Sequence, residues 1–428
     1  MLTIHQEEKL GELLYLILNQ GKKRVVLQGS AGVGKTYLVQ ELLRRLRNQG
    51  ARGLFYVTAP TNKALAVLKK KVIEETFIVF KTVHSALSLT RQINFETGEE
   101  TFVPGRTNIL PFEGAGLCIV DEASMLSKEL LKYLDEHPGM PTIFIGDAKQ
   151  LPPVKESISP IFAKDYPIVE LTEIIRQGEG NPIIDLSRNL SWVKGNNECI
   201  VASETEENKY IGFTYSSDKQ KVIDALAAVN GTDDIKYLAW HNADVDKMNR
   251  LVRTKIYGEP AKIELGEVLV LSKPYLDRYT NEEIEVKKLE IKEERMIYPT
   301  AATQFRKGLI SSGPGTYEQV NLKVYVVNGY IRVIHEDSET EYRKLSSELK
   351  SDCKSKRKSW PAYYWFIEQL AHVTYNHAIT VHKSQGSTYK KAIINVKDIN
   401  QNFKSDERTK LFYTAVTRAS DLVILYNN

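Results

Sequence analysis

Eight residues near the start of the chain have the types and spacing of a phosphate-binding loop. They are Gly29, Ser30, Ala31, Gly32, Val33, Gly34, Lys35 and Thr36, in the pattern G-x-x-x-x-G-K-[ST]. Such glycines let backbone N–H groups converge on phosphates at the start of a helix. Lys35 would reach the β- and γ-phosphates, and the Thr36 hydroxyl would bind Mg²⁺. The pattern therefore predicts a site for a nucleoside triphosphate and magnesium.

Two adjacent carboxylates follow the apolar run 117–120, at the end of a predicted strand. Mg²⁺ prefers oxygen ligands and keeps most of its waters, so one carboxylate, Asp121, can suffice as a protein ligand. Glu122 would then polarise an attacking water. Taken alone, the pair could equally cap a helix. The phosphate loop upstream favours hydrolysis.

Three further side chains are candidates for contacts with the γ-phosphate. Gln150 follows the strand-like run 142–145, and its uncharged amide is suited to sensing whether that phosphate is present. Arg176 and Arg418 are candidate arginine fingers, which stabilise charge on a transferred phosphoryl group. A lone arginine is more often a surface residue, so only the whole set of motifs favours these two.

Composition sets loose bounds. The chain has 428 residues, enough for two or three domains, and its net charge of +4 neither requires nor excludes a nucleic-acid partner. Its cysteines, Cys118, Cys199 and Cys353, form no C-x-x-C pair, so neither a zinc site nor a disulfide framework is indicated. A reducing, cytosol-like compartment fits this usage. We find no secretory signal and no apolar run of membrane-spanning length.

The elements that must position these residues alternate between short apolar runs and helical stretches. Such alternation predicts an α/β fold with parallel sheets and ligands at the carboxyl ends of the strands. The segment 91–111 does not follow this alternation of strands and helices, and its own pattern predicts an inserted hairpin. A second insertion, 262–369, is rich in strand-like runs, and Asn328-Gly329 within it indicates a two-residue hairpin turn. Its basic run 354–358 is either a solvated surface loop or a contact with backbone phosphates.

The order of the motifs resembles superfamily 1 helicases, in the RecD/Dda branch of 5′→3′ DNA helicases, over nearly the whole chain. Residues 2–6 resemble the Q motif, so Gln6 would read adenine. Residues 59–64 resemble motif Ia, 82–87 motif Ib, 121–124 motif II and 146–153 motif III. Residues 171–177 resemble motif IV, 380–388 motif V and 413–419 motif VI. Gly386, in the motif V segment, would join the ATP site.

The resemblance implies two RecA-like P-loop domains, 1–168 and 169–428, with ATP in the cleft between them. It also implies a strand-separating hairpin, or pin, at 90–112 and an SH3-like β module at 260–368. Single-stranded DNA would cross both domains. The expected DNA contacts are Pro60, Thr61, Asn62, Thr82, His84, Phe95, Phe102, Asn242, Thr380, His382 and Lys383.

Some of these assignments have an equally plain structural alternative. His84 and His382 would read as structural histidines without their motifs. Phe95 and Phe102 could pack the hairpin onto its parent domain, or one ring could stack on a base at the fork.

The resemblance implies an ATP-dependent DNA helicase that translocates 5′→3′ and unwinds duplex DNA, with ATP and Mg²⁺ as cofactors. The alternative is an ATP-driven single-stranded DNA translocase that remodels protein–DNA complexes with little unwinding. A P-loop kinase or GTPase lacks support, since no guanine-reading Asn-Lys-x-Asp is present.

We expect single-stranded and forked duplex DNA as partners, along with replication or recombination proteins, in a role in DNA replication, recombination or repair. We expect no membrane partner and activity as a monomer. We also expect a location in the bacterial cytoplasm and a phage or mobile-element origin.

Overall fold

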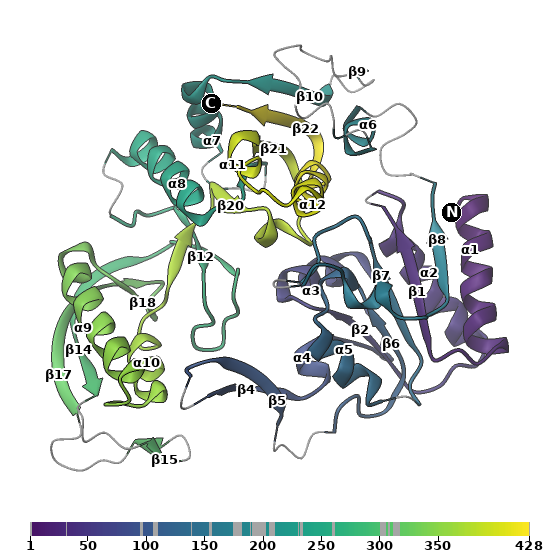
Figure 1. Ribbon diagram of the computed structural model, residues 1–428, viewed down its shortest axis with the longest axis horizontal. Coiled ribbons are helices and arrows are strands. Elements are labelled where there is room, and N and C mark those ends of the chain that lie inside the picture. The colour runs from purple at the N-terminus through teal and green to yellow at the C-terminus, as the bar shows by residue number, and fades with distance from the viewer. Residues whose placement is uncertain are drawn as a thin grey trace.

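The computed structural model describes residues 2–30, 32–94, 97–105, 110–137, 139–153, 156–173, 182–188, 190, 203–204, 210–229, 231, 234–258, 262–299, 305–306, 309–310 and 317–427. Two α/β lobes and a third, mostly antiparallel unit make up the molecule (Figure 1). Among the described residues no helix is long and apolar enough to cross a membrane.

The first lobe is built on a six-stranded parallel sheet in the order β3-β2-β6-β7-β1-β8. Its strands are β1 (Arg24–Gly29), β2 (Leu54–Ala59), β3 (Ile78–Thr82), β6 (Ala115–Val120), β7 (Thr142–Gly146) and β8 (Ile168–Leu171). Its helices are α1 (Ile4–Leu14), α2 (Lys35–Asn48), α3 (Asn62–Lys71), α4 (Val83–Ala86) and α5 (Lys128–Asp135), with a π-helical segment η1 (Tyr15–Asn19) after α1 and short 3₁₀ helices η2 (Ala123–Met125) and η3 (Pro160–Ala163). The apolar face of α2 packs into the core of this lobe, where Leu38, Leu42 and Leu46 are buried.

The second lobe carries another six-stranded sheet, in the order β20-β11-β21-β22-β10-β9. Its pairs are parallel except β9 with β10. The strands are β9 (Ser203–Glu204), β10 (Tyr210–Ser216), β11 (Ile235–Ala239), β20 (Ala378–Thr380), β21 (Tyr389–Asn395) and β22 (Ala419–Tyr426). The helices are α6 (Pro182–Arg188), α7 (Lys219–Ala228), α8 (Asn242–Tyr257), α11 (Val396–Ile399) and α12 (Ser405–Val416), with the short turn η5 (His382–Ser384).

This architecture is the predicted pair of RecA-like folds. The first sheet extends to Leu171, so the predicted domain boundary at 168/169 falls at the start of β8. The boundary itself stays a prediction.

An antiparallel hairpin projects from the first lobe. Its strands β4 (Leu89–Ile93) and β5 (Glu100–Pro104) pair from Leu89 with Pro104 to Ile93 with Glu100. The hairpin begins one residue before the predicted insertion 90–112 and ends inside it, and its strand-separating role stays a prediction.

The second insertion contains two three-stranded antiparallel sheets, β13-β12-β19 and β14-β17-β18, and two helices that lie between β18 and β19 in sequence. The elements are β12 (Val268–Leu271), β13 (Glu283–Glu285), β14 (Leu289–Pro299), β15 (Phe305–Arg306), β16 (Leu309–Ile310), β17 (Tyr317–Val327), β18 (Ile331–Ile334), α9 (Glu336–Lys354), α10 (Trp360–Ile367) and β19 (Val373–Tyr375). Leu269 and Tyr325 share one core across the two sheets. We call this unit the β module, since an SH3-like identity stays a prediction.

The Asn-Gly turn prediction is confirmed. Asn328 and Gly329 join β17 to β18 with φ values of 52° and 85°. Two successive positive φ values are typical of the type I′ hairpin turn, whose twist matches that of paired strands.

The hairpin β4–β5 reaches across to α10 of the β module (Figure 1). The Tyr364 hydroxyl donates to Gly98 O at 2.8 Å, and Arg91 pairs with Glu368 at 2.6 Å. The Trp360 ring lies so close to Gly98 that a Cβ there would come within 2.3 Å of it. The hairpin is therefore braced by an element more than 250 residues further along the chain.

Candidate functional site

The predicted phosphate loop joins β1 to α2 at the carboxyl edge of the first sheet. Gly34 caps α2 with φ 79°, a left-handed conformation that glycine adopts without steric cost. Lys35 Nζ donates to Gly29 O at 2.7 Å and to Ser30 O at 2.8 Å. The ammonium thus lies inside the loop, where phosphate oxygens would replace these carbonyls. Ala31 lies outside the described residues.

Gln6 is engaged by the protein itself. Its Nε2 donates to Val33 O at 3.2 Å, and its Oε1 accepts from Thr3 N at 3.2 Å as part of the cap of α1. The side chain is 2% exposed. In this arrangement Gln6 ties α1 to the phosphate loop, so its role in reading adenine stays a prediction.

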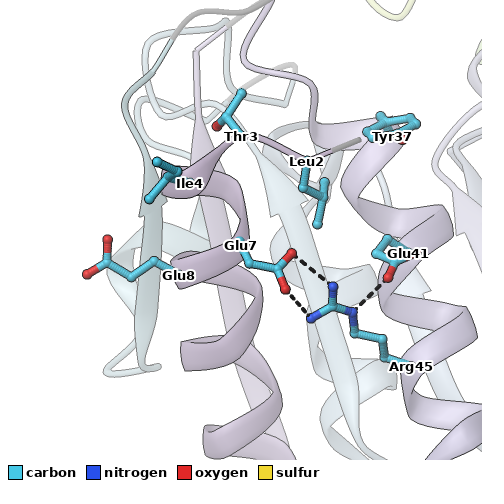
Figure 2. A pocket seen from close by; sticks show the side chains of 8 residues that line it. All are labelled: Leu2, Thr3, Ile4, Glu7, Glu8, Tyr37, Glu41 and Arg45. Atoms are coloured by element: carbon cyan, nitrogen blue, oxygen red, sulfur yellow. Dashed lines mark hydrogen bonds and ion pairs between the residues drawn. The ribbon is translucent and has the colours of Figure 1, made fainter.

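A cavity of about 690 Å³ opens beside the loop, between α1 and α2. Figure 2 shows Arg45 between two carboxylates, with Nη1 2.7 Å from Glu7 and Nε 2.7 Å from Glu41. The Tyr37 ring, in the first turn of α2, lies above Glu41 and Arg45 in Figure 2, and the Leu2 side chain lies beside it. The full lining is Leu2, Thr3, Ile4, Glu7, Glu8, Tyr37, Glu41 and Arg45.

Asp121 and Glu122 lie at the carboxyl end of β6, as predicted. Asp121 Oδ1 accepts from Glu122 N at 2.9 Å, and Glu122 has φ 50°. Burial, and then the neighbouring Glu122 charge, raise the pKa of Asp121 to about 6, which Lys35 partly opposes. A divalent cation would relieve the repulsion between these two carboxylates. With the Thr36 hydroxyl in the first turn of α2, the pair fits magnesium.

The carboxyl end of β7 meets α12 of the second lobe. Tyr413 Oη donates to Asp147 Oδ2 at 2.6 Å, and Leu151 N donates to Thr414 Oγ1 at 3.2 Å. Gln385 Nε2 donates to Leu151 O at 3.1 Å. The motif III and motif VI segments are therefore in direct contact across the two lobes.

Gln150 lies at this junction and is 5% exposed. Its Oε1 is buried and accepts no hydrogen bond from the part of the chain that the structure describes. A buried carbonyl oxygen without a donor is costly, and a ligand or water could supply one.

Arg418 follows α12 and is held by its own lobe. It is 5% exposed and donates to Thr414 O, Ser387 O and Thr417 Oγ1 at 3.0–3.1 Å.

Gly386 has φ 74°, and a Cβ there would lie 3.2 Å from Ala64 Cβ of α3. Motif V thus packs against motif Ia. Arg176 lies outside the described residues.

The predicted DNA contacts lie where strands end and helices begin. Thr61 caps α3 and Thr82 caps α4 through their hydroxyls, at 3.2 Å each. Pro60 and Asn62 flank Thr61 and are half-buried. In the second lobe, Asn242, Thr380 and Lys383 line one cleft together with Lys63 of the first lobe.

The aromatic residues predicted to contact DNA differ in their surroundings. The Phe102 ring lies 4.5 Å from the His84 ring, centroid to centroid, and Phe102 is 36% exposed. This favours packing of the hairpin onto its lobe as one role of Phe102. Burial lowers the pKa values of His84 and His382, so both are neutral near pH 7. Phe95 lies outside the described residues.

The sequence interpretation missed several polar contacts. The sequence patterns assign no role to Tyr413, Thr414 or Gln385, although all three lie within motifs. Gln385 and Thr414 both form hydrogen bonds with Leu151. His241 Nδ1 lies 2.6 Å from Asp398 Oδ1, and that carboxylate also accepts from the backbone of residues 240 and 241. Only the polar character of these residues within buried segments could have signalled such contacts.

Comparison with known proteins agrees with this geometry. Residues 9–207 match the AAA domain family, and residues 375–426 match the UvrD-like helicase C-terminal domain. The ATP-dependent DNA helicase dda of Enterobacteria phage T4 is 27% identical, over 94% of each chain. An uncharacterized protein of Acanthamoeba polyphaga mimivirus is 26% identical, over 98% of this chain and 99% of its own.

The fold matches solved helicase structures. Pif1 helicases at forked double-stranded DNA share 18% identity and a TM-score of 0.51, over 99% of this chain and 92% of theirs. The Bacteroides Pif1 helicase with ADP-AlF3 and single-stranded DNA shares 19% identity and a TM-score of 0.50, over 97% and 91%. The ordered motifs and these sequence relatives support a superfamily 1 helicase of the RecD, Dda and Pif1 branch, and the solved Pif1 structures agree with it in the fold.

Proposed function

We propose that this protein is an ATP-dependent DNA helicase that translocates 5′→3′ on single-stranded DNA and unwinds duplex DNA as a monomer. The observation that carries the proposal is the contact of Asp147 and Leu151 with α12. It joins the phosphate-binding lobe to the segment that bears Arg418. Two lobes in contact at one nucleotide edge can convert a change at the phosphates into relative movement.

The residues have distinct roles in this proposal. Lys35 leaves its loop carbonyls to bind the β- and γ-phosphates. Thr36 and Asp121 would hold Mg²⁺, which would neutralise phosphate charge. Glu122 polarises the attacking water. Gln150 senses the γ-phosphate, while Arg418 and Arg176 stabilise the charge that develops on it. The cavity between α1 and α2 takes the nucleoside, with Tyr37 and Leu2 as its apolar end.

DNA as the partner is supported by the relatives' names and by the polar groups on both lobes. Hydroxyls, amides and Lys383 at strand ends suit backbone phosphates, which carry no sequence information. The 5′→3′ polarity rests on the family resemblance. The alternative, a translocase with little unwinding, differs only in what the hairpin β4–β5 does at a fork.

A strand-displacement assay on 5′-tailed and 3′-tailed duplexes tests the proposal, run beside ATPase assays with and without single-stranded DNA. We expect ATPase stimulation by single strands and displacement of the 5′-tailed duplex only. Lys35→Ala should lose both activities while remaining folded. Displacement of the 3′-tailed duplex would contradict the polarity, and stimulated ATPase without displacement would identify a translocase.

A further inference from the structure

The basic run before α10 lies beside the brace of the hairpin. Residues 352–358 contain four cations and one carboxylate, Asp352. Ser359 separates them from Trp360, whose ring packs against Gly98 in the hairpin turn. A strongly positive loop is therefore fixed next to the tip of the element that we propose to separate strands.

The loop has a rigid backbone. Lys356 N donates to Cys353 O at 3.1 Å and Arg357 N donates to Asp352 O at 2.8 Å, which is the hydrogen-bond pattern of a Schellman motif at the end of α9. Cys353 Sγ also contacts Ser359 O at 3.2 Å, joining the two ends of the loop. The side chains are thus presented from a fixed frame.

The cations of the loop divide into inward and outward groups. Lys358 is 11% exposed, pairs with Asp352 and lies 4.8 Å above the Tyr298 ring, so its role is structural. Lys354, Lys356 and Arg357 are exposed. Within the described part of the chain, Lys354 and Lys356 form no ion pair, and Arg357 has only a long contact of 3.8 Å with Asp352. Three cations are therefore available to an anionic partner.

Stabilisation of helix α9 can account for only one of these three exposed cations. Lys354 lies in the last turn of α9, where a cation interacts favourably with the helix dipole. Lys356 and Arg357 lie beyond the helix. Lys356 has φ 60°, in the position where glycine is the usual residue. A lysine at that position is unfavourable for the backbone, so the fold alone gives no reason for it.

We propose that Lys354, Lys356 and Arg357 bind backbone phosphates of the duplex immediately ahead of the hairpin. This rests on the proposed function, because it takes the hairpin as the point where strands part. The loop would hold the parent duplex against the hairpin while the two lobes pull one strand. Such contacts are independent of base sequence and weaken with salt.

The test uses Lys354→Gln, Lys356→Gln and Arg357→Gln combined in the full chain. Binding is measured by fluorescence anisotropy at several salt concentrations. The probes are a single strand, a duplex with one 5′ tail, and a fork with two tails. We expect about tenfold weaker binding of both duplex-containing probes, and a salt slope reduced by about 2 to 3. Single-strand binding and single-strand-stimulated ATPase should stay at wild-type values.

The control variant combines Lys22→Gln, Lys23→Gln and Lys221→Gln, three exposed lysines away from the hairpin. It removes the same charge and should leave binding of all three probes unchanged. Equal weakening on the single strand, weakening on the two-tailed fork alone, or no change on any probe would each overturn the proposal. Failure of the proposed function would show separately, as a wild-type protein without DNA-stimulated ATPase.

Discussion

At the residue scale, the two cations that the proposed mechanism assigns to ATP, Lys35 and Arg418, are held by oxygen atoms of the protein. Lys35 binds two carbonyls of its own loop, and Arg418 binds three groups of its own lobe. A buried cation without such partners would be costly. In the proposed mechanism, both side chains would exchange these oxygen atoms for phosphate oxygens when ATP binds.

Glu122 offers the sharpest test of hydrolysis at this scale. Glu122→Gln keeps the shape of the side chain and removes the charge that would polarise water, while Asp121 can still hold Mg²⁺. We expect turnover to fall by about 10²- to 10⁴-fold with ATP affinity retained. Single-turnover hydrolysis and equilibrium binding of a fluorescent ATP analogue measure the two effects. Near-normal turnover would mean that another group orients the water.

At the element scale, the hairpin depends on a glycine. A Cβ at Gly98 would lie 2.3 Å from the Trp360 ring, and the φ of 71° disfavours any other residue. We expect Gly98→Ala to break the brace to α10, impairing strand displacement at least severalfold while sparing single-strand-stimulated ATPase. Gly139→Ala is the control, since nothing lies within 4 Å of its added Cβ. Unimpaired displacement by Gly98→Ala would mean that the brace is dispensable.

Local sequence patterns predicted the elements but not the contacts between them. The phosphate loop, Asp121-Glu122 and the Asn328-Gly329 turn could be predicted because each depends on neighbours within a few residues. The contact of Gly98 with Trp360 and that of Leu151 with Gln385 join segments more than 230 residues apart. Such contacts depend on how whole elements dock. The bond of Gln6 to Val33 O was unpredictable for the same reason, whereas its bonds with Thr3 form a local capping box.

At the scale of the whole molecule, a buried histidine lies where the β module rejoins the second lobe. His377 is 2% exposed between β19 and β20, and burial, followed by the charges of Lys236 and Arg253, lowers its pKa to about 4. Its ordinary pKa near 6.5 applies in the unfolded chain, so the unfolded state binds the proton first as pH falls. Stability should therefore decrease from about pH 6.5 down to about pH 4.

His377→Gln removes this proton uptake. We expect the wild-type protein to lose about 2 kcal/mol more than the variant between pH 7.5 and pH 5. Urea unfolding at the two pH values measures the difference. Because the other buried histidines titrate in both proteins, the comparison isolates one site. An equal loss of unfolding free energy in both proteins would mean that His377 binds a proton as readily in the folded state as in the unfolded state.

The contact between the two lobes should determine how readily the nucleotide cleft closes. Tyr413→Phe removes the hydroxyl that binds Asp147 and keeps the ring, which is 4% exposed in the second lobe. A hydrogen bond to a charged group contributes about 1.5–3 kcal/mol, so the closed arrangement would become at least tenfold less favourable. We expect the KM for ATP to rise about tenfold in the presence of single-stranded DNA, with kcat at saturating ATP nearly unchanged.

Tyr166→Phe is the matched control, because its hydroxyl binds Asp135 at 2.9 Å within the first lobe and does not cross between lobes. Its KM should equal that of the wild type. If Tyr413→Phe leaves KM unchanged, the lobes close without this bond. If Tyr166→Phe raises KM equally, the effect reflects general loosening of the first lobe, and the junction of β7 with α12 is not what couples ATP binding to the approach of the second lobe.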